Sequence, residues 1–166
     1  MFDNVSTPKE LFAHKLGAAL TMEQKVLGML DDLTEAAQSE ELKQQFQHHR
    51  QETEGQIRNL EQCFHALGED VDDSPCPAIE GLEKEGKANI KMTDERLLDA
   101  VVLPAAAETE HHEIAVYEGL IEHADAMGAT DVAALLRENL EQETHTLREV
   151  QQATGKVAAR TAQLAA

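Results

Sequence analysis

The sequence has no tryptophan, few aromatic residues of any kind (3%) and few basic residues, and each shortage excludes a class of protein. Its 166 residues include 14 Lys and Arg against 32 Asp and Glu, a formal net charge of −18 at pH 7. Such a charge repels nucleic acids and anionic lipid surfaces, so we expect neither as a partner, and it favours cations as ligands. The scarcity of aromatic residues, together with abundant Ala, Leu, Glu and Gln, favours an all-α protein over a β-sandwich or barrel.

Cysteines and long apolar runs are scarce as well. Cys63 and Cys76 are too few for a disulfide framework and their spacing fits no common zinc pattern, which predicts a reducing, cytoplasmic environment. The N-terminal stretch lacks a basic start followed by an apolar run, and no window approaches about 18 consecutive apolar residues. We therefore expect a soluble, unexported protein. The length predicts one domain over residues 1–166, with a core from about residue 6 to 155 and a frayed C-terminal tail.

Apolar residues recur at helical spacing in four long segments, which are about 7–37, 39–68, 93–128 and from 130 onward. Gly68 and Gly128 offer C-caps to the second and third segments. A loop rich in Asp, Ser and Pro follows Gly68 and leads to a short helix near residues 79–92. This order predicts an antiparallel four-helix bundle with one long crossover that contains the short extra helix, the arrangement of ferritin-like proteins.

Each long segment carries a glutamate that interrupts its apolar stripe near the middle: Glu23, Glu52 beside the line of His49 and Gln56, Glu113 and Glu143. A buried ionised carboxylate destabilises a protein unless it is paired or bound to metal. Four carboxylates that converge on one core would repel one another and become protonated. Two divalent cations remove that repulsion, and hard oxygen ligands suit Fe²⁺ or Mn²⁺. The pattern predicts a di-iron or di-manganese centre.

Helical geometry adds two neighbours to this set. His49 precedes Glu52 by three residues and Glu110 precedes Glu113 by three, so each pair shares one helix face. The separation of Glu23 from Glu52 also nearly equals that of Glu113 from Glu143, which indicates a rough two-fold relation between the halves of the site. The predicted metal ligands are Glu23, His49, Glu52, Glu110, Glu113 and Glu143.

The pattern departs from the usual di-iron site in its histidines. The Glu-x-x-His pairs of that site are missing, because Gly55 and Thr146 occupy the expected histidine positions. His49 could supply an imidazole in reversed order, or His112 could supply one. The alternative is a carboxylate-rich site that binds metal weakly.

Five stretches carry a family resemblance: EQKVLGML, ETEGQIRNLEQCF, CPAIEGLEKEG, ETEHHEIAVYEGL and, more weakly, ENLEQETHTL. In this order and spacing, over roughly residues 8–150, the chain resembles the YciE/YciF family of bacterial ferritin-like proteins. The resemblance implies a ferritin-like bundle with a di-metal centre, a homodimer and a role in bacterial stress responses. Two departures concern the site: His112 stands where the family often has an aromatic residue, and Leu147 lies near a position that is often acidic.

Two functions follow as alternatives. The first is a di-metal protein that oxidises Fe²⁺ with O₂ or peroxide, and the second is a non-catalytic structural or interaction protein with an incomplete metal site. Storage of iron in a large shell is a weaker third alternative.

The two cysteines are interpreted as structural. Cys76 lies between two prolines, and the sequence places no general base near it, so we interpret it as a packing thiol. We expect Cys63 to pack inside its helix.

Overall fold

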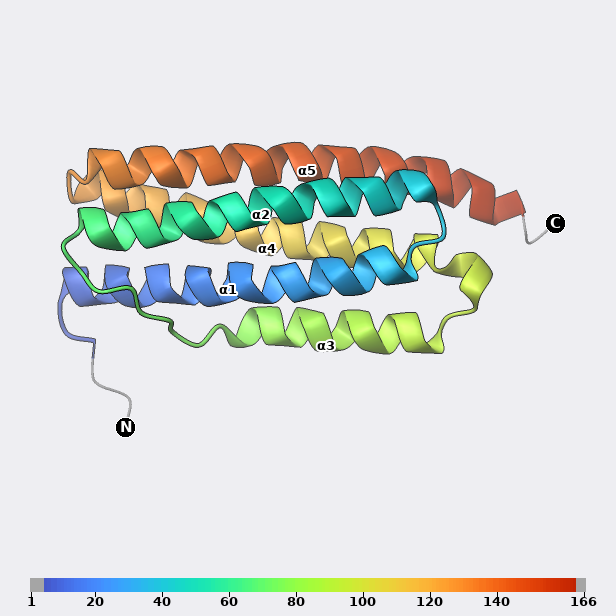
Figure 1. The fold of residues 1–166 in the computed structure, drawn as a ribbon, viewed down its shortest axis with the longest axis horizontal. Coiled ribbons are helices and arrows are strands. Elements are labelled where there is room, and N and C mark those ends of the chain that lie inside the picture. The colour runs from blue at the N-terminus through green and yellow to red at the C-terminus, as the bar shows by residue number, and fades with distance from the viewer. Residues whose placement is uncertain (1–4, 164–166) are drawn as a thin grey trace.

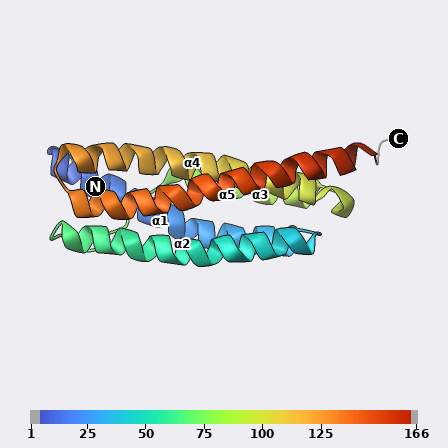
Figure 2. The ribbon, with the colours of Figure 1, turned by 90° about the horizontal axis from the view of Figure 1, so that it is seen from above.

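The computed structural model describes residues 5–163, and within that range the secondary structure is entirely helical. The elements, in chain order, are α1 (Pro8–Ala36), α2 (Glu40–Ala66), α3 (Pro77–Met92), the 3₁₀ turn η1 (Glu95–Leu97), α4 (Asp99–Ala126) and α5 (Thr130–Ala162). The four long helices lie side by side, with α1 antiparallel to α2 and α4 antiparallel to α5 (Figure 1). Seen from above, α2 and α5 lie in front of α1 and α4 (Figure 2). The all-α prediction is confirmed.

Local sequence signals set the ends of these helices. Thr7 caps α1 by accepting a hydrogen bond from the Glu10 amide at 3.2 Å, and the Glu10 carboxylate accepts one from the Thr7 amide in return. Gly68 and Gly128 close α2 and α4 at φ of 70° and 71°. Glycine adopts this left-handed conformation without a Cβ clash, which allows the chain to reverse.

The connection between α2 and α4 runs across α1. A Cβ at Gly17 would lie 2.9 Å from the Asp72 backbone oxygen, so only glycine lets the loop approach α1 this closely. The chain then forms α3, which packs against α1 and α4 through the buried Ile79 and lies below α1 in Figure 1. An ion pair of 3.5 Å between Lys25 and Glu83 also links α1 to α3.

Two boundaries differ from the sequence-based prediction. The fourth segment was expected to fray after about residue 155, but α5 is helical to Ala162. Val157 is buried, and Arg160 donates a hydrogen bond of 2.8 Å to the buried carboxylate of Asp99, so the last turns are anchored to the start of α4. The third segment begins later than predicted, because Asp94 caps the 3₁₀ turn instead of a long helix.

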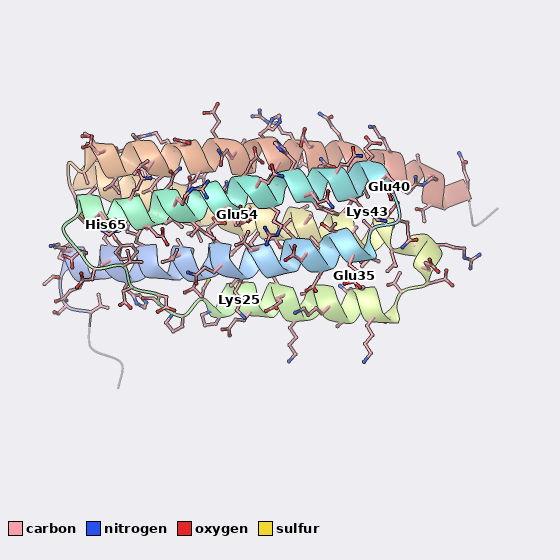
Figure 3. The ribbon with its side chains drawn as sticks, in the orientation of Figure 1. Lys25, Glu35, Glu40, Lys43, Glu54 and His65 are labelled. Atoms are coloured by element: carbon pink, nitrogen blue, oxygen red, sulfur yellow. The ribbon has the colours of Figure 1, made fainter. Side chains whose placement is uncertain are left out.

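The outer faces carry much of the charge. Glu35 on α1 and Glu40, Glu54 and His65 on α2 are exposed (Figure 3). No helix within residues 5–163 combines the length and apolar character needed to cross a bilayer.

Candidate metal centre

Ionisable side chains occupy the middle of the core that the four long helices enclose. Glu23, His49, Glu110, Glu113 and Glu143 are each at most 2% exposed. One ligand atom from each of four of them, all except Glu23, lies within 4.8 Å of the others. α1 supplies Glu23, α2 His49, α4 the next two glutamates and α5 the last, so every long helix contributes to this carboxylate cluster.

At one side of the cluster, which we call the His49 end, an imidazole lies among carboxylates. His49 Nε2 is 3.1 Å from Glu110 Oε1 and 3.6 Å from Glu143 Oε2. His49 Nδ1 is 3.2 Å from the Thr146 hydroxyl and 3.5 Å from Glu52 Oε2. The side chain of Glu52 is 21% exposed, so this end of the cluster reaches towards the solvent.

At the opposite side, which we call the Tyr117 end, the hydrogen-bond partners that surround the Glu23 carboxylate are uncharged. Tyr117 is fully buried and its hydroxyl donates a short hydrogen bond to Glu23 Oε1. The amide nitrogen of Asn139 donates to the Tyr117 oxygen at 3.1 Å and to the Gln56 backbone oxygen at 3.3 Å. Asn59 donates to Asn139 Oδ1 at 2.8 Å. Uncharged polar side chains from α2, α4 and α5 are therefore linked by hydrogen bonds to Glu23.

Most oxygens of the cluster have no hydrogen-bond partner. The unpartnered atoms are one oxygen each of Glu23 and Glu110 and both oxygens of Glu113 and Glu143. None of the buried side chains in the described range is Lys or Arg, so His49 is the sole cationic partner in this core. Buried carboxylates without partners are strongly destabilising. Oxygen-rich donors with one imidazole suit Fe²⁺ or Mn²⁺, so the residues present fit such a metal.

Burial and mutual repulsion shift the pKa values in the direction that opposes ionisation. Burial raises the pKa of Glu23 from 4.5 to about 7, although the hydrogen bond from Tyr117 lowers it in part. Burial and the charges of neighbouring carboxylates raise the pKa of Glu113 and Glu143 well above the usual range. Burial alone would lower the pKa of His49, but Glu110 and its other acidic neighbours raise it well above 6.5. The acidic neighbours therefore favour the imidazolium over the neutral imidazole.

Four of the six predicted ligands form the close group, and Glu23 is a direct neighbour of Glu113 within the buried core. Glu52 contacts His49 but lies at the partly exposed rim, and its pKa is lowered by a hydrogen bond from His49. His112, the alternative source of an imidazole, is half-buried and lies 3.8 Å from Cys76 Sγ, outside the cluster. Cys76 therefore has a base beside it, in contrast to the sequence-based reading. Cys63 is fully buried, as predicted.

Sequence reasoning missed the polar residues that support the cluster, which are Tyr117, Asn139 and Thr146. Tyr117 is fully buried, whereas its neighbour Val116 is only partly buried. The spacing could have revealed this, because Tyr117 follows Glu113 by four residues and Asn139 precedes Glu143 by four. Each therefore lies on the same helix face as a predicted ligand.

Comparison with known proteins assigns the chain to a family. A family model described as a domain of unknown function, DUF892, matches residues 7–163. The chain belongs to the DUF892 family. Protein YciF of Escherichia coli K12 is 34% identical over 145 residues, which cover 86% of this chain and 87% of that protein. The resemblance to the YciE/YciF family is thereby confirmed.

Solved structures of relatives share the helical fold. The E. coli stress protein YciF matches with a TM-score of 0.89 and 30% identity, over 93% of this chain and 99% of that one. YcfI from Rhodopseudomonas palustris, named as a candidate structural protein, matches with a TM-score of 0.86 and 32% identity, over 91% and 97% of the two chains. A Xanthomonas campestris protein, 21% identical with a TM-score of 0.75 over 95% of this chain and 97% of that one, shares the fold alone.

Proposed function

We propose that this DUF892 protein is a ferritin-like four-helix bundle whose buried carboxylate cluster binds a pair of Fe²⁺ or Mn²⁺ ions and oxidises Fe²⁺ with O₂ or peroxide. One observation carries the proposal: buried carboxylate oxygens from α1, α4 and α5 converge in the core with the His49 imidazole of α2, and most of these oxygens have no hydrogen-bond partner. Because such groups destabilise a fold that gives them no partner, a bound cation explains why they face one another.

The residues of the cluster can be assigned to two cation positions. His49, Glu110 and Glu143 can hold a cation at the His49 end, and Glu23 can hold one at the Tyr117 end. Both oxygens of Glu113 lack a hydrogen-bond partner, and Glu113 neighbours both the ligand atoms of the His49 end and Glu23. When bound, an iron pair would supply the electrons that reduce O₂ or peroxide. The chain excludes bulk water from the centre, since its core ligands are almost completely buried.

The proposal is tested by adding Fe²⁺ anaerobically, admitting O₂ and following Fe³⁺ absorbance and oxygen uptake. The wild-type protein should oxidise Fe²⁺ faster than buffer alone, and the double variant Glu23→Ala/Glu113→Ala should oxidise it no faster than buffer. Glu118→Ala provides a matched control, because Glu118 is exposed on the same helix as Glu113. Circular dichroism checks that each variant is folded. A double variant that oxidises iron at the wild-type rate contradicts the proposal.

A second function is favoured by a different observation. The relative YcfI is named as a candidate structural protein, and the raised pKa values would let this chain keep its core carboxyls neutral without metal. A structural or interaction protein with a vestigial site should melt at the same temperature in chelator and in excess Mn²⁺. A melting temperature that rises with Mn²⁺ concentration argues against this alternative.

The setting of the protein is also part of the proposal. A relative is named a stress protein, which supports a role for this chain in a bacterial stress response. We propose the cytoplasm as its compartment, because two cysteines are too few for a disulfide framework. We propose a homodimer as the working form. Sedimentation at the size of a dimer would agree with this and would exclude a storage shell.

A further inference from the structure

The Tyr117 end of the cluster contains a chain of hydrogen bonds whose direction is fixed. The Gln56 backbone oxygen is purely an acceptor, so the side of Asn139 that faces it must be the NH₂ group. The same NH₂ group then faces the Tyr117 oxygen and donates to it. Because Asn139 already donates to that oxygen, the phenolic proton of Tyr117 has to point elsewhere, and it is donated to Glu23.

The opposite side of Asn139 supports the same direction. Its Oδ1 accepts a hydrogen bond of 2.8 Å from Asn59 Nδ2, as expected for the carbonyl side of the amide. Both Asn139 and Tyr117 are fully buried. Water therefore does not compete for these groups. The direction of donation along this row of hydrogen bonds follows from one acceptor, the Gln56 backbone oxygen.

This arrangement distinguishes Glu23 from Glu113 and Glu143. Its Oε1 is occupied by the phenol, and its Oε2 has no partner. Glu113 and Glu143, by contrast, have both oxygens free. The structure therefore holds Glu23 in one orientation with a single oxygen available to a cation.

We propose that Tyr117 is a positioning residue that presents Glu23 to a divalent cation through Oε2 alone, and that Asn139 acts on Glu23 through Tyr117. This inference rests on the proposed metal-binding function and assigns roles to two residues outside the ligand set. Outer hydrogen bonds of this kind orient a ligand, and their loss typically weakens metal binding about 10–100-fold.

Mn²⁺ alone is the probe, and the amplitude of its free-ion paramagnetic resonance signal measures binding. Tyr117→Phe keeps the aromatic ring and should weaken Mn²⁺ binding about 10–100-fold without changing the number of ions bound. Asn139→Ala should weaken it less. The double variant should bind no more weakly than Tyr117→Phe alone, because Asn139 has no route to Glu23 once the hydroxyl is gone.

Cys63→Ala is the matched control. Cys63 is fully buried on α2, where its thiol contacts the Val132 backbone oxygen of α5 at 3.9 Å, and no hydrogen bond links it to Tyr117 or Glu23. If Asn139 had only a structural role, the double variant should lose Mn²⁺ affinity by the product of the losses of the two single variants. Multiplied effects, or a Tyr117→Phe variant that binds Mn²⁺ as tightly as wild type, overturn the inference.

The tyrosine absorption of the wild-type protein provides an independent test. It has one tyrosine and no tryptophan, so the near-ultraviolet band of these chromophores comes from Tyr117 alone. Cation binding at Glu23 should weaken the phenol's hydrogen bond and shift this band, whereas an unchanged band on Mn²⁺ saturation overturns the inference. A wild-type protein that binds no Mn²⁺ overturns the proposed function as well, so the two failures are distinguishable.

Discussion

The two ends of the carboxylate cluster differ in the groups that stabilise their buried carboxylates. At the His49 end, an imidazolium lies between Glu110 and Glu143 and reaches the rim through Glu52. At the Tyr117 end, the partners are a phenol and an amide, which carry no charge. The first end is partly neutralised by the protein itself, and the second depends on a proton or a cation. The difference predicts which substitutions destabilise the metal-free protein and which abolish metal binding.

The largest expected effect concerns the imidazolium. His49→Leu removes the cationic partner from the buried carboxylates, so we expect the metal-free protein to lose about 3–5 kcal/mol of unfolding free energy at pH 7. Tyr117→Phe should lose about 1–2 kcal/mol, because it removes one hydrogen bond to a carboxylate. Urea unfolding in chelator measures both, with the exposed His111→Leu as a control. Equal losses at the two ends contradict the comparison.

The next effect is the pH dependence of the metal-free protein. The folded protein holds the Glu23 proton up to a pKa of about 7, whereas the unfolded chain releases it near 4.5. Stability should therefore fall as pH rises from 5 to 8, by roughly 3 kcal/mol from this group alone. The raised pKa of His49 acts with the same sign, since its stabilisation is lost as the imidazolium deprotonates.

Urea unfolding in chelator across this pH range measures the slope. Glu23→Gln should make the slope shallower, because glutamine has no proton to release and the other titrating groups remain. A metal-free protein whose stability is constant or rises from pH 5 to 8 would show that the carboxyl groups are not held protonated in the fold.

Glu113→Gln should have an effect of opposite sign to that of His49→Leu. Glu113 has no hydrogen-bond partner and lies among like charges, so its replacement by a neutral side chain should stabilise the metal-free protein by about 1–2 kcal/mol at pH 8. The same variant should lose the rise in melting temperature that Mn²⁺ produces in wild type. Melting curves in chelator and in Mn²⁺ provide both values, and a destabilised metal-free variant is the contrary result.

The smallest effect is expected at the rim. Glu52→Gln should change stability by less than about 1 kcal/mol, since Glu52 is partly exposed and its ion pair with His49 is partly screened. Its metal content should equal that of wild type. A reduced number of bound ions would restore Glu52 to the ligand set that the sequence predicts, and elemental analysis of the purified variant decides between the two.

The sequence predicted the helices well because their apolar periodicity and glycine caps are local signals. It also predicted Glu23, Glu113 and Glu143 as inward-facing residues, since each interrupts an apolar stripe. The polar residues that form hydrogen bonds to the cluster were harder to predict from the sequence. Tyr117 looks like an ordinary core residue until its partner on another helix is known, and that partner depends on how four helices pack. Glu52 lies at the rim because its helical phase places it beside the buried line of His49 and Gln56, and its role as a ligand stays a prediction.

The metal content of the protein tests the central claim most directly. Protein loaded anaerobically with Fe²⁺ or with Mn²⁺ and then freed of excess ions should contain about two metal ions per chain by elemental analysis, and Glu23→Ala should contain fewer. A folded wild-type protein that remains empty after loading would contradict the account, because its core carboxylates would then be held by protons alone.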